Sequence, residues 1–169
     1  MATLSESTCP GCGLNMPAGE RPSYDGYFNA SSQCRSVFTE VLAAEFSNAF
    51  LFGRVHQLTV DAYAVQHAGG LHPDKSVDVH LCGLYWMLNQ GVAPTAVPKM
   101  IQGLAGVIHD WPHFLPPSDR GTLTVFDVAL ANSVEDHIRI AREWANSVWN
   151  SWRLHHIAIA DLASDRLKW

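Results

Sequence analysis

The sequence predicts an all-α protein, a single-domain bundle of about five helices. Apolar residues recur at helical spacing through most of the chain, no segment alternates as a strand would, and no internal repeat is present. At 169 residues the chain is long enough for one buried core and short for two. We therefore treat residues 1–169 as one domain, with residues 1–32 as a segment packed on the bundle.

The N-terminal segment is predicted to be rich in loops. Residues 1–30 contain four glycines, three prolines and the first two cysteines, among turn-forming Asn, Ser and Asp. Such a segment buries little apolar surface of its own, so an additional interaction must hold it against the bundle.

Two helices should follow in direct succession. Ser31 and Ser32 can cap a helix over residues 33–52, which Gly53 would end. The second covers residues 55–67 and stops at the Gly-Gly pair that follows. A connection this short makes the two helices antiparallel neighbours.

The middle of the chain predicts two more helices and a loop. The third helix starts near residues 74–76 and ends at Gly91, and a fourth over residues 94–108 begins with a proline in its first turn. Residues 109–121 contain three prolines, so they should form a surface loop.

The C-terminal part is predicted to be helical from a capping pair, Thr124 and Asp127, with a break near Asn132 and Ser133. One apolar face then continues to the end and should pack against the bundle as a single long helix. Its members are Val134, Ile138, Ala141, Ala145, Val148, Trp152, His155, Ile159 and Leu162.

Charge and hydropathy exclude two classes of partner. The net charge is -5, the pI is near 5.9, and the eleven Lys and Arg form no basic stripe, so we do not expect nucleic-acid binding. No run reaches the roughly 18 apolar residues of a membrane helix, and the first residues lack a basic and apolar leader. We therefore expect a cytoplasmic protein that does not associate with membranes.

Three cysteines predict a zinc site. Cys9 and Cys12 lie in the run Cys-Pro-Gly-Cys-Gly, whose glycines let backbone N–H groups point at the thiolates, and Cys34 follows 22 residues later. The alternatives are reduced thiols or a redox pair. Disulfides are less expected because no secretion signal is present.

A structural zinc ion needs a fourth ligand, and helix geometry favours His67. If the first two helices are antiparallel, Cys34 at the start of one lies beside His67 at the end of the other. His56 would then lie roughly 16 Å away, at 1.5 Å per residue. His72 and His80 remain as alternative fourth ligands, because the third helix also starts at this end.

Polar residues on the second and third helices suggest a further site. Asp61, His67 and His80 are candidates for catalytic donors or a general base. Clustered aromatic and histidine side chains can line a ligand cleft, although at helical spacing they more often belong to a core. The candidate cleft residues are Tyr63, His137, Trp144, Trp152 and His156.

Four motifs resemble an uncharacterised bacterial family described only as a domain of unknown function. They are the Cys-Pro-Gly-Cys-Gly opening, Val-His-Gln-Leu-Thr-Val-Asp-Ala-Tyr-Ala-Val-Gln-His at 55–67, Ser-Val-x-x-His-Leu at 76–81, and Trp-Ala-Asn-Ser-Val-Trp-Asn-Ser-Trp at 144–152 with two histidines after it. The resemblance implies one small domain and no particular activity. It adds weight to Cys9, Cys12, Cys34, His67 and His80. Ala68 departs from the pattern, which has proline there, and this change should loosen the turn.

Three functional hypotheses follow. The first is a zinc-binding accessory or binding module, closed by three cysteines and one histidine, with a small-molecule or protein partner. The second is a metal-dependent enzyme with a polar pocket near the metal. The third is a cysteine-based redox or transfer catalyst. No standard catalytic or nucleotide-binding motif is present, and the oligomeric state stays open.

Overall fold

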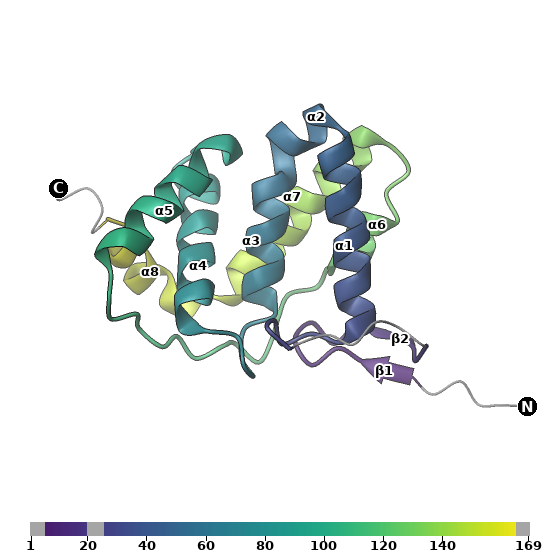
Figure 1. Cartoon of the computed structure of the whole chain (residues 1–169), viewed down its shortest axis with the longest axis horizontal. Helices are drawn as coiled ribbons and strands as arrows, with labels where there is room; N and C mark the ends of the chain where they lie inside the picture. The colour runs from purple at the N-terminus through teal and green to yellow at the C-terminus, as the bar shows by residue number, and fades with distance from the viewer. Residues whose placement is uncertain (1–5, 20–25, 165–169) are drawn as a thin grey trace, which may run out of the picture.

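The computed structural model describes residues 6–19 and 26–164, and it confirms the predicted helical fold (Figure 1). The larger helices are α1 (Ser32–Ser47), α3 (Gln57–Gln66), α4 (Asp74–Leu88), α5 (Val97–Val107), α7 (Val134–Ser151) and α8 (His156–Ser164). The shorter ones are α2 (Ala49–Leu51), the π-helical turn η1 (Phe52–His56), the 3₁₀ turns η2 (Pro94–Ala96) and η3 (Arg153–His155), and α6 (Val125–Ala129).

The helices form two layers around one core. In Figure 1, α1, α3, α4 and α5 lie side by side in front, while α6, α7 and α8 pack behind them against α1, α3 and α4. α3 lies in the front layer between α4 and α1, packs on α7 behind it, and has eight of its ten residues buried. Polar side chains on α3 therefore need partners inside the protein.

The break between the first two helices lies at Asn48, not at Gly53 as predicted. The Asn48 side chain accepts hydrogen bonds from the backbone N–H groups of Phe50, at 3.0 Å, and Leu51, at 3.2 Å. Asparagine is among the best residues for this capping role, so a new helix begins there. Gly53 lies instead within η1, in continuous helical backbone.

The C-terminal part contains two helices rather than the single long one predicted. The expected break before α7 is present, and Ser133 caps the helix by accepting from the backbone N–H of Asp136. A second break follows at Trp152, where α7 ends and the buried indole anchors the turn. The imidazole of His156 bonds the carbonyl of Trp149 at 2.9 Å, the same carbonyl that accepts the backbone N–H of Trp152 at 3.0 Å. α8 then packs on α4.

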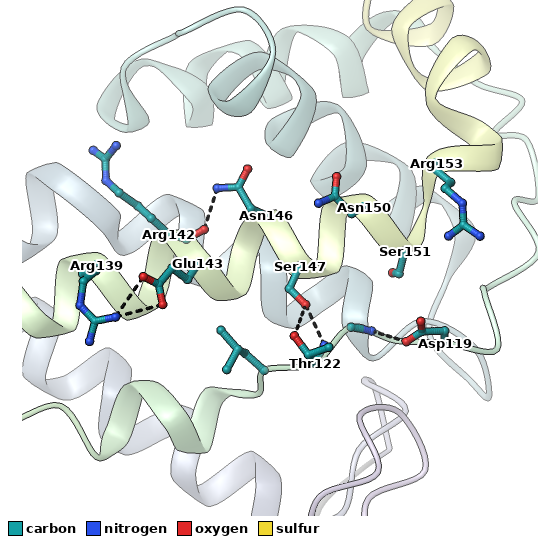
Figure 2. A pocket seen from close by; sticks show the side chains of 12 residues that line it. Asp119, Thr122, Arg139, Arg142, Glu143, Asn146, Ser147, Asn150, Ser151 and Arg153 are labelled. Carbon is teal, nitrogen blue, oxygen red and sulfur yellow. Dashed lines mark hydrogen bonds and ion pairs between the residues drawn. The ribbon is translucent and has the colours of Figure 1, made fainter.

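The loop over residues 109–121 has no regular structure, as predicted, and its end is firmly attached to the bundle. The Gln66 side chain donates to the carbonyls of Arg120, at 2.9 Å, and Leu123, at 2.8 Å. Thr122 donates its backbone N–H to Ser147 on α7 (Figure 2). The predicted capping box at Thr124 then starts α6.

The N-terminal segment contains a short hairpin that the sequence did not predict. β1 (Glu6–Thr8) and β2 (Asn15–Pro17) pair antiparallel below the start of α1 in Figure 1, with Ser7 opposite Met16. Strands of three residues are too short to show an alternating pattern. The hairpin brackets the segment that carries Cys9 and Cys12.

No described helix combines the length and apolar character needed to cross a membrane. The prediction that the chain starts without a leader rests on its first residues, and residues 1–5 lie outside the described residues.

Candidate metal centre

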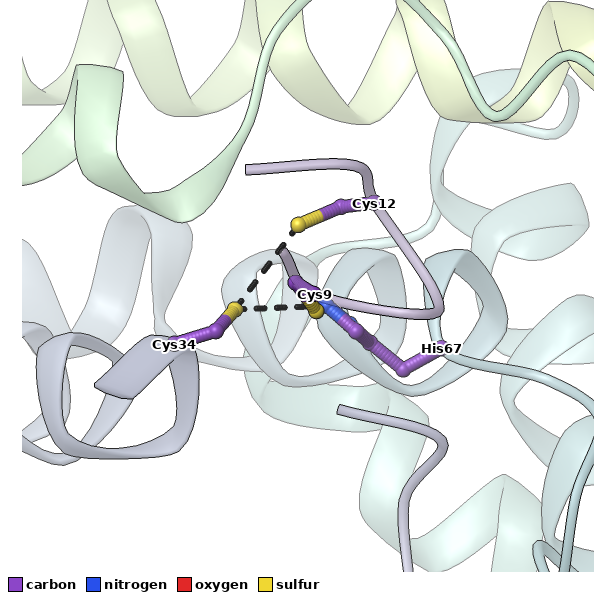
Figure 3. A group of neighbouring side chains, drawn as sticks. All are labelled: Cys9, Cys12, Cys34 and His67. Atoms are coloured by element: carbon purple, nitrogen blue, oxygen red, sulfur yellow. Dashed lines mark hydrogen bonds between the residues drawn. The ribbon is translucent and has the colours of Figure 1, made fainter. Parts of the chain in front are cut away.

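Four side chains converge where the N-terminal hairpin meets the ends of two helices. The sulfur atoms of Cys9, Cys12 and Cys34 and a ring nitrogen of His67 all lie within 4.8 Å of one another (Figure 3). The first two cysteines come from the hairpin loop, Cys34 from the first turn of α1, and His67 from the end of α3. The antiparallel pairing of these helices brings the four residues together.

The hairpin loop needs two glycines to present its cysteines. Gly13 has φ +76, a left-handed conformation that favours glycine, and it donates its N–H to the Cys9 carbonyl at 2.9 Å. At Gly11 a Cβ atom would lie 2.4 Å from the Asn29 carbonyl oxygen and 2.5 Å from a ring carbon of His67. The missing side chain is therefore what lets this loop approach the end of α3.

Cys34 is fixed by the cap of α1 and by an aromatic contact. Its backbone N–H donates to the Ser31 hydroxyl at 3.1 Å, as expected of a helix cap. The hydroxyl of Tyr63 donates to the Cys34 sulfur at 3.6 Å, and the tyrosine ring stacks on Phe38 with 3.7 Å between centroids. Cys34 is therefore held at its backbone by Ser31 and at its sulfur by Tyr63.

The orientation of His67 leaves one ring nitrogen available for a metal. Its Nδ1 lies 2.7 Å from the Tyr63 carbonyl oxygen, which only a protonated nitrogen can satisfy. Nε2 then carries the lone pair, and it lies 3.4 Å from the Cys34 sulfur. A carbonyl that fixes the tautomer in this way is typical of metal-binding histidines.

Two of the six distances between the four ligand atoms match the edges of a tetrahedral zinc site. Zinc bonds of about 2.3 Å to sulfur and about 2.0 Å to nitrogen imply edges of about 3.8 Å between two sulfurs and about 3.5 Å between sulfur and nitrogen. The two measured edges are 3.8 Å, from Cys12 to Cys34, and 3.4 Å, from Cys34 to His67. The donor set, three thiolates and one imidazole, is one that structural zinc prefers.

The electrostatics of the thiols also favour a cation. Hydrogen bonds from Cys12 and Cys34 lower the pKa of the Cys9 thiol. At Cys34, contacts with Cys12 and Cys9, together with burial, raise the pKa of the thiol. The Cys9 thiolate therefore forms readily, and its negative charge opposes the ionisation of the other two thiols. A divalent cation removes this repulsion and allows all three to ionise.

A partly buried arginine lies next to the site. The Arg120 guanidinium donates to the carbonyls of Gln66, at 3.0 Å, and Ala68, at 3.1 Å, beside His67. Burial lowers the pKa of Arg120, while the charge of Cys9 raises it. Three thiolates and one zinc ion would carry a net negative charge, which this cation partly balances. The sequence indicated Arg120 only as a lone cation in a proline-rich loop.

The other two histidines proposed as fourth ligands have different partners. Both ring nitrogens of His72 are engaged, with the His67 carbonyl at 3.1 Å and the Ser76 hydroxyl at 2.8 Å. Burial lowers the pKa of His72 to about 4, so this ring is neutral. His80 bonds Asp61 through Nδ1 at 2.6 Å. Of the three candidates, the geometry brings only His67 into the cluster of possible metal ligands.

Asp61 and His80 form a dyad between α3 and α4. The Asp61 carboxylate is fully buried, accepts from Gln57 at 2.7 Å through the oxygen that bonds His80, and has no partner for its second oxygen among the described residues. Burial raises the pKa of Asp61, against the effect of these hydrogen bonds. A Cβ atom at Gly83 would lie 2.0 Å from that second oxygen. The His80 side chain keeps 19% of its surface exposed.

The five candidate cleft residues have different neighbours. Tyr63 contacts Cys34, His137 bonds Glu45, and the Trp144 indole donates to Gln66 at 3.0 Å. The remaining two lie near the end of α7: Trp152 is buried, and His156 stacks on Trp149 at 3.9 Å. These contacts belong to several parts of the core rather than to one shared group.

A buried carboxylate that the sequence analysis missed lies at the opposite end of α1. Glu45 bonds His56 and His137, both at 2.9 Å, and accepts from the Thr59 hydroxyl at 2.6 Å. Although burial opposes ionisation, these bonds hold the pKa of Glu45 below its ordinary value. The one available signal was an acidic residue within the apolar stripe of the first helix, four residues after Val41.

The fourth cysteine plays no part in the cluster. Cys82 is buried in α4, burial raises the pKa of its thiol, and all four cysteines are free of disulfides. A reactive cysteine needs access to its substrate. Cys9 is 1% exposed and Cys34 is 0% exposed, whereas Cys12 is partly exposed, so Cys12 is the one thiol of the cluster with access to solvent.

Comparison with known proteins identifies the family. The model of a family described as "Family of unknown function (DUF5946)" matches residues 7–153, a span that includes all four possible metal ligands. The chain belongs to DUF5946. The family resemblance drawn from the motifs is therefore confirmed. No curated protein and no solved structure matches the chain.

Proposed function

We propose that this DUF5946 protein is a zinc-stabilised helical module in which a closed Cys3His centre fastens the N-terminal hairpin to the ends of α1 and α3. The observation that carries the proposal is the cluster of four possible ligand atoms within 4.8 Å. Catalytic zinc sites usually keep one position for water or substrate, whereas structural sites use four protein ligands. The donor set therefore favours a structural role.

The hairpin needs such a fastening. Its strands have three residues each, and an isolated two-stranded hairpin is marginally stable in water. Zinc binding would supply the free energy that orders it. We infer that the ordered module acts in binding or in support of another component, with a small-molecule or protein partner. We also propose a cytoplasmic location, which agrees with four cysteines free of disulfides.

Metal analysis tests the proposal directly. Protein produced without a histidine tag should contain one zinc ion per chain, and Cys12→Ser should lose most of it together with the order of the hairpin. Cys82→Ser is the matched control, because it removes a buried cysteine outside the cluster and should keep the metal. A well-folded wild-type chain without metal would contradict the proposal.

A second candidate function is acid–base catalysis at His80. The buried Asp61 carboxylate orients the ring through Nδ1, and the partly exposed histidine would use Nε2 to exchange protons with a substrate. This activity would not use the metal, and in that respect it differs from the metal-dependent enzyme expected from the sequence. A screen with ester, phosphoester and amide substrates tests it. Turnover that His80→Ala abolishes while the fold persists would support it, and turnover unchanged in that variant would remove His80 from consideration.

A further inference from the structure

We propose that a groove along the exposed side of α7 binds a small polar molecule bearing phosphate or carboxylate groups. Two hollows, of about 740 Å³ and about 340 Å³, adjoin there, and Arg142 and Asn146 line both. Figure 2 shows the larger one, between α7 and the segment around Thr122. The larger hollow is broad and open to solvent rather than enclosed.

The groove has the opposite charge balance to the rest of the chain. The whole sequence has 11 Lys and Arg against 16 Asp and Glu. Among the described residues that line the two hollows, arginines outnumber carboxylates by four to two. The arginines are Arg54, Arg139, Arg142 and Arg153, and the carboxylates are Asp119 and Glu143. The groove is therefore a local positive region on an acidic protein.

Several of these charges already have partners. Arg139 bonds both carboxylate oxygens of Glu143 at 3.0 Å and also pairs with Asp136. Asp119 accepts the backbone N–H of Gly121 at 3.0 Å, and the Arg54 guanidinium lies over the Phe50 ring.

Two guanidinium groups remain available. Arg142 and Arg153 have no hydrogen bond or ion pair from their side chains to any other residue that the structure describes. A guanidinium is planar and presents paired N–H donors that match the oxygens of a phosphate or a carboxylate. These two residues are therefore the expected anion contacts.

Amide groups extend the same surface. Arg142, Asn146 and Asn150 follow one another at intervals of four residues, and Figure 2 shows their side chains extending from the same side of α7. The Asn146 amide nitrogen donates to the Arg142 carbonyl, which leaves its oxygen free to accept. From Arg142 to Asn150 the stripe is about 12 Å long, at 1.5 Å per residue. It suits a molecule that carries hydroxyl groups beside its anionic group.

The segment that borders the larger hollow, on the other side of α7 from these side chains in Figure 2, is rigid. Gly121 has φ +94, and a Cβ atom there would lie 2.7 Å from the Ser147 hydroxyl oxygen, so the loop presses directly on α7. That hydroxyl accepts the Thr122 N–H at 2.7 Å. The same loop is held by Gln66, the residue before His67. The groove is thus shaped before any ligand binds, which reduces the entropy cost of binding.

The features favour a small ligand over a nucleic acid. Binding a nucleic-acid backbone uses many cations along an extended surface, and two free arginines on a chain of net charge -5 do not supply them. Phosphorylated sugars or nucleotides and polycarboxylic acids share the chemistry that the two arginines recognise. The experiment therefore separates these two sources.

Isothermal titration calorimetry on the full-length, zinc-loaded protein tests the proposal with three probes: inorganic pyrophosphate, citrate and the neutral disaccharide sucrose. At least one anion should bind saturably below about 10 mM, and sucrose should not. At least one of Arg142→Gln and Arg153→Gln should weaken that binding about tenfold, because the two side chains lie at opposite ends of the larger hollow in Figure 2 and a small anion contacts one of them. Lys99→Gln, an exposed cation on α5 that lines neither hollow, is the matched control and should leave binding unchanged.

Each outcome decides one way. Pyrophosphate binding alone would support a phosphorylated ligand, citrate binding alone would support a carboxylate ligand, and binding of both would support the shared chemistry. The proposal would be overturned if neither anion bound. It would also be overturned if the Arg142→Gln/Arg153→Gln double variant bound the anion as tightly as the wild type. Zinc content and circular dichroism of the same variants separate this result from the metal proposal, because both should stay at wild-type values.

Discussion

The two ends of α1 are fastened to the following helix by different chemistry. At one end, three thiols and His67 gather where the N-terminal hairpin meets α1 and α3. At the other end, the Glu45 carboxylate bonds His56, Thr59 and His137. His56, the last residue of η1, and His67, which follows α3, are eleven residues apart and serve one end each.

The difference lies in how charge is compensated. The Glu45 carboxylate has three donors from the protein itself, so its pKa falls below its ordinary value despite burial. The thiols have mainly one another, so the ionisation of one opposes that of the next. One end is therefore complete as a protein structure, whereas the other brings together four side chains that could hold an added cation. Separate perturbations should distinguish the two ends.

Metal removal should produce the largest effect, and only at the cysteine end. A strong chelator should cost several kcal/mol of stability, since structural zinc contributes about 10 kcal/mol or more in small zinc domains. Hydrogen exchange measured by mass spectrometry should rise in residues 9–16 and 29–34, while residues 45–60 stay protected. Equal loss of protection at both ends would show that the two fastenings are not independent.

Glu45→Gln should give the next largest effect, at the opposite end. Removing the charge leaves two histidines with a poorer partner in a buried site, and we expect a loss of about 3 kcal/mol in the free energy of unfolding. Urea denaturation of the zinc-loaded protein measures it. Exposed Glu40→Gln on the same helix is the control and should change stability little. A variant that loses its zinc would contradict the separation of the two ends.

Acid should release the cysteine end first. Protons compete with the metal for thiolates and imidazole, so zinc binding weakens as the pH falls through about 6 to 5. Glu45 has a folded pKa below its ordinary value of 4.5. Its contribution is therefore complete above that value and is lost only as the pH falls through the lower folded pKa. A zinc indicator dye and circular dichroism, followed together during acidification, should show metal release before helix loss. The reverse order would refute this.

The smallest effects should come from removing one hydroxyl donor at each end. Thr59→Val deletes a hydrogen bond to Glu45 and should cost about 1–2 kcal/mol without changing metal affinity. Tyr63→Phe deletes the hydrogen bond to Cys34 and should weaken zinc binding up to about tenfold. Competition with a chromophoric chelator measures the affinity. A Tyr63→Phe variant with unchanged affinity would mean that the hydroxyl only fills space.

The metal cluster was predictable because its chemistry uses few residue types. Spacing of the cysteines indicated zinc, and a short connection between helices made His67 the nearest histidine. The Glu45 cluster was not predictable in the same way, because Glu45 and His137 are 92 residues apart. A buried carboxylate can take partners from any neighbouring element, and only the packed structure selects them.

Helix boundaries depended on details of side-chain bonding. Asn48 and Gly53 both suggest a break, and the amide of Asn48 accepts two backbone N–H groups that a glycine cannot. The end of α7 at Trp152 had no glycine or proline to indicate it. The apolar pattern of the sequence continues through this break, because the Trp152 indole at the break is buried and α8 after it packs on α4.

The contact between Gly83 and Asp61 restricts how α3 and α4 can move. A methyl group at position 83 would overlap the buried carboxylate, so the two helices meet at one register and cannot slide past each other without expelling Asp61. The carboxylate in turn bonds His80, which belongs to α4 itself. Position 83 therefore works as a spacer gauge in this chain: any side chain there would have to displace the buried carboxylate of Asp61 or move the two helices apart.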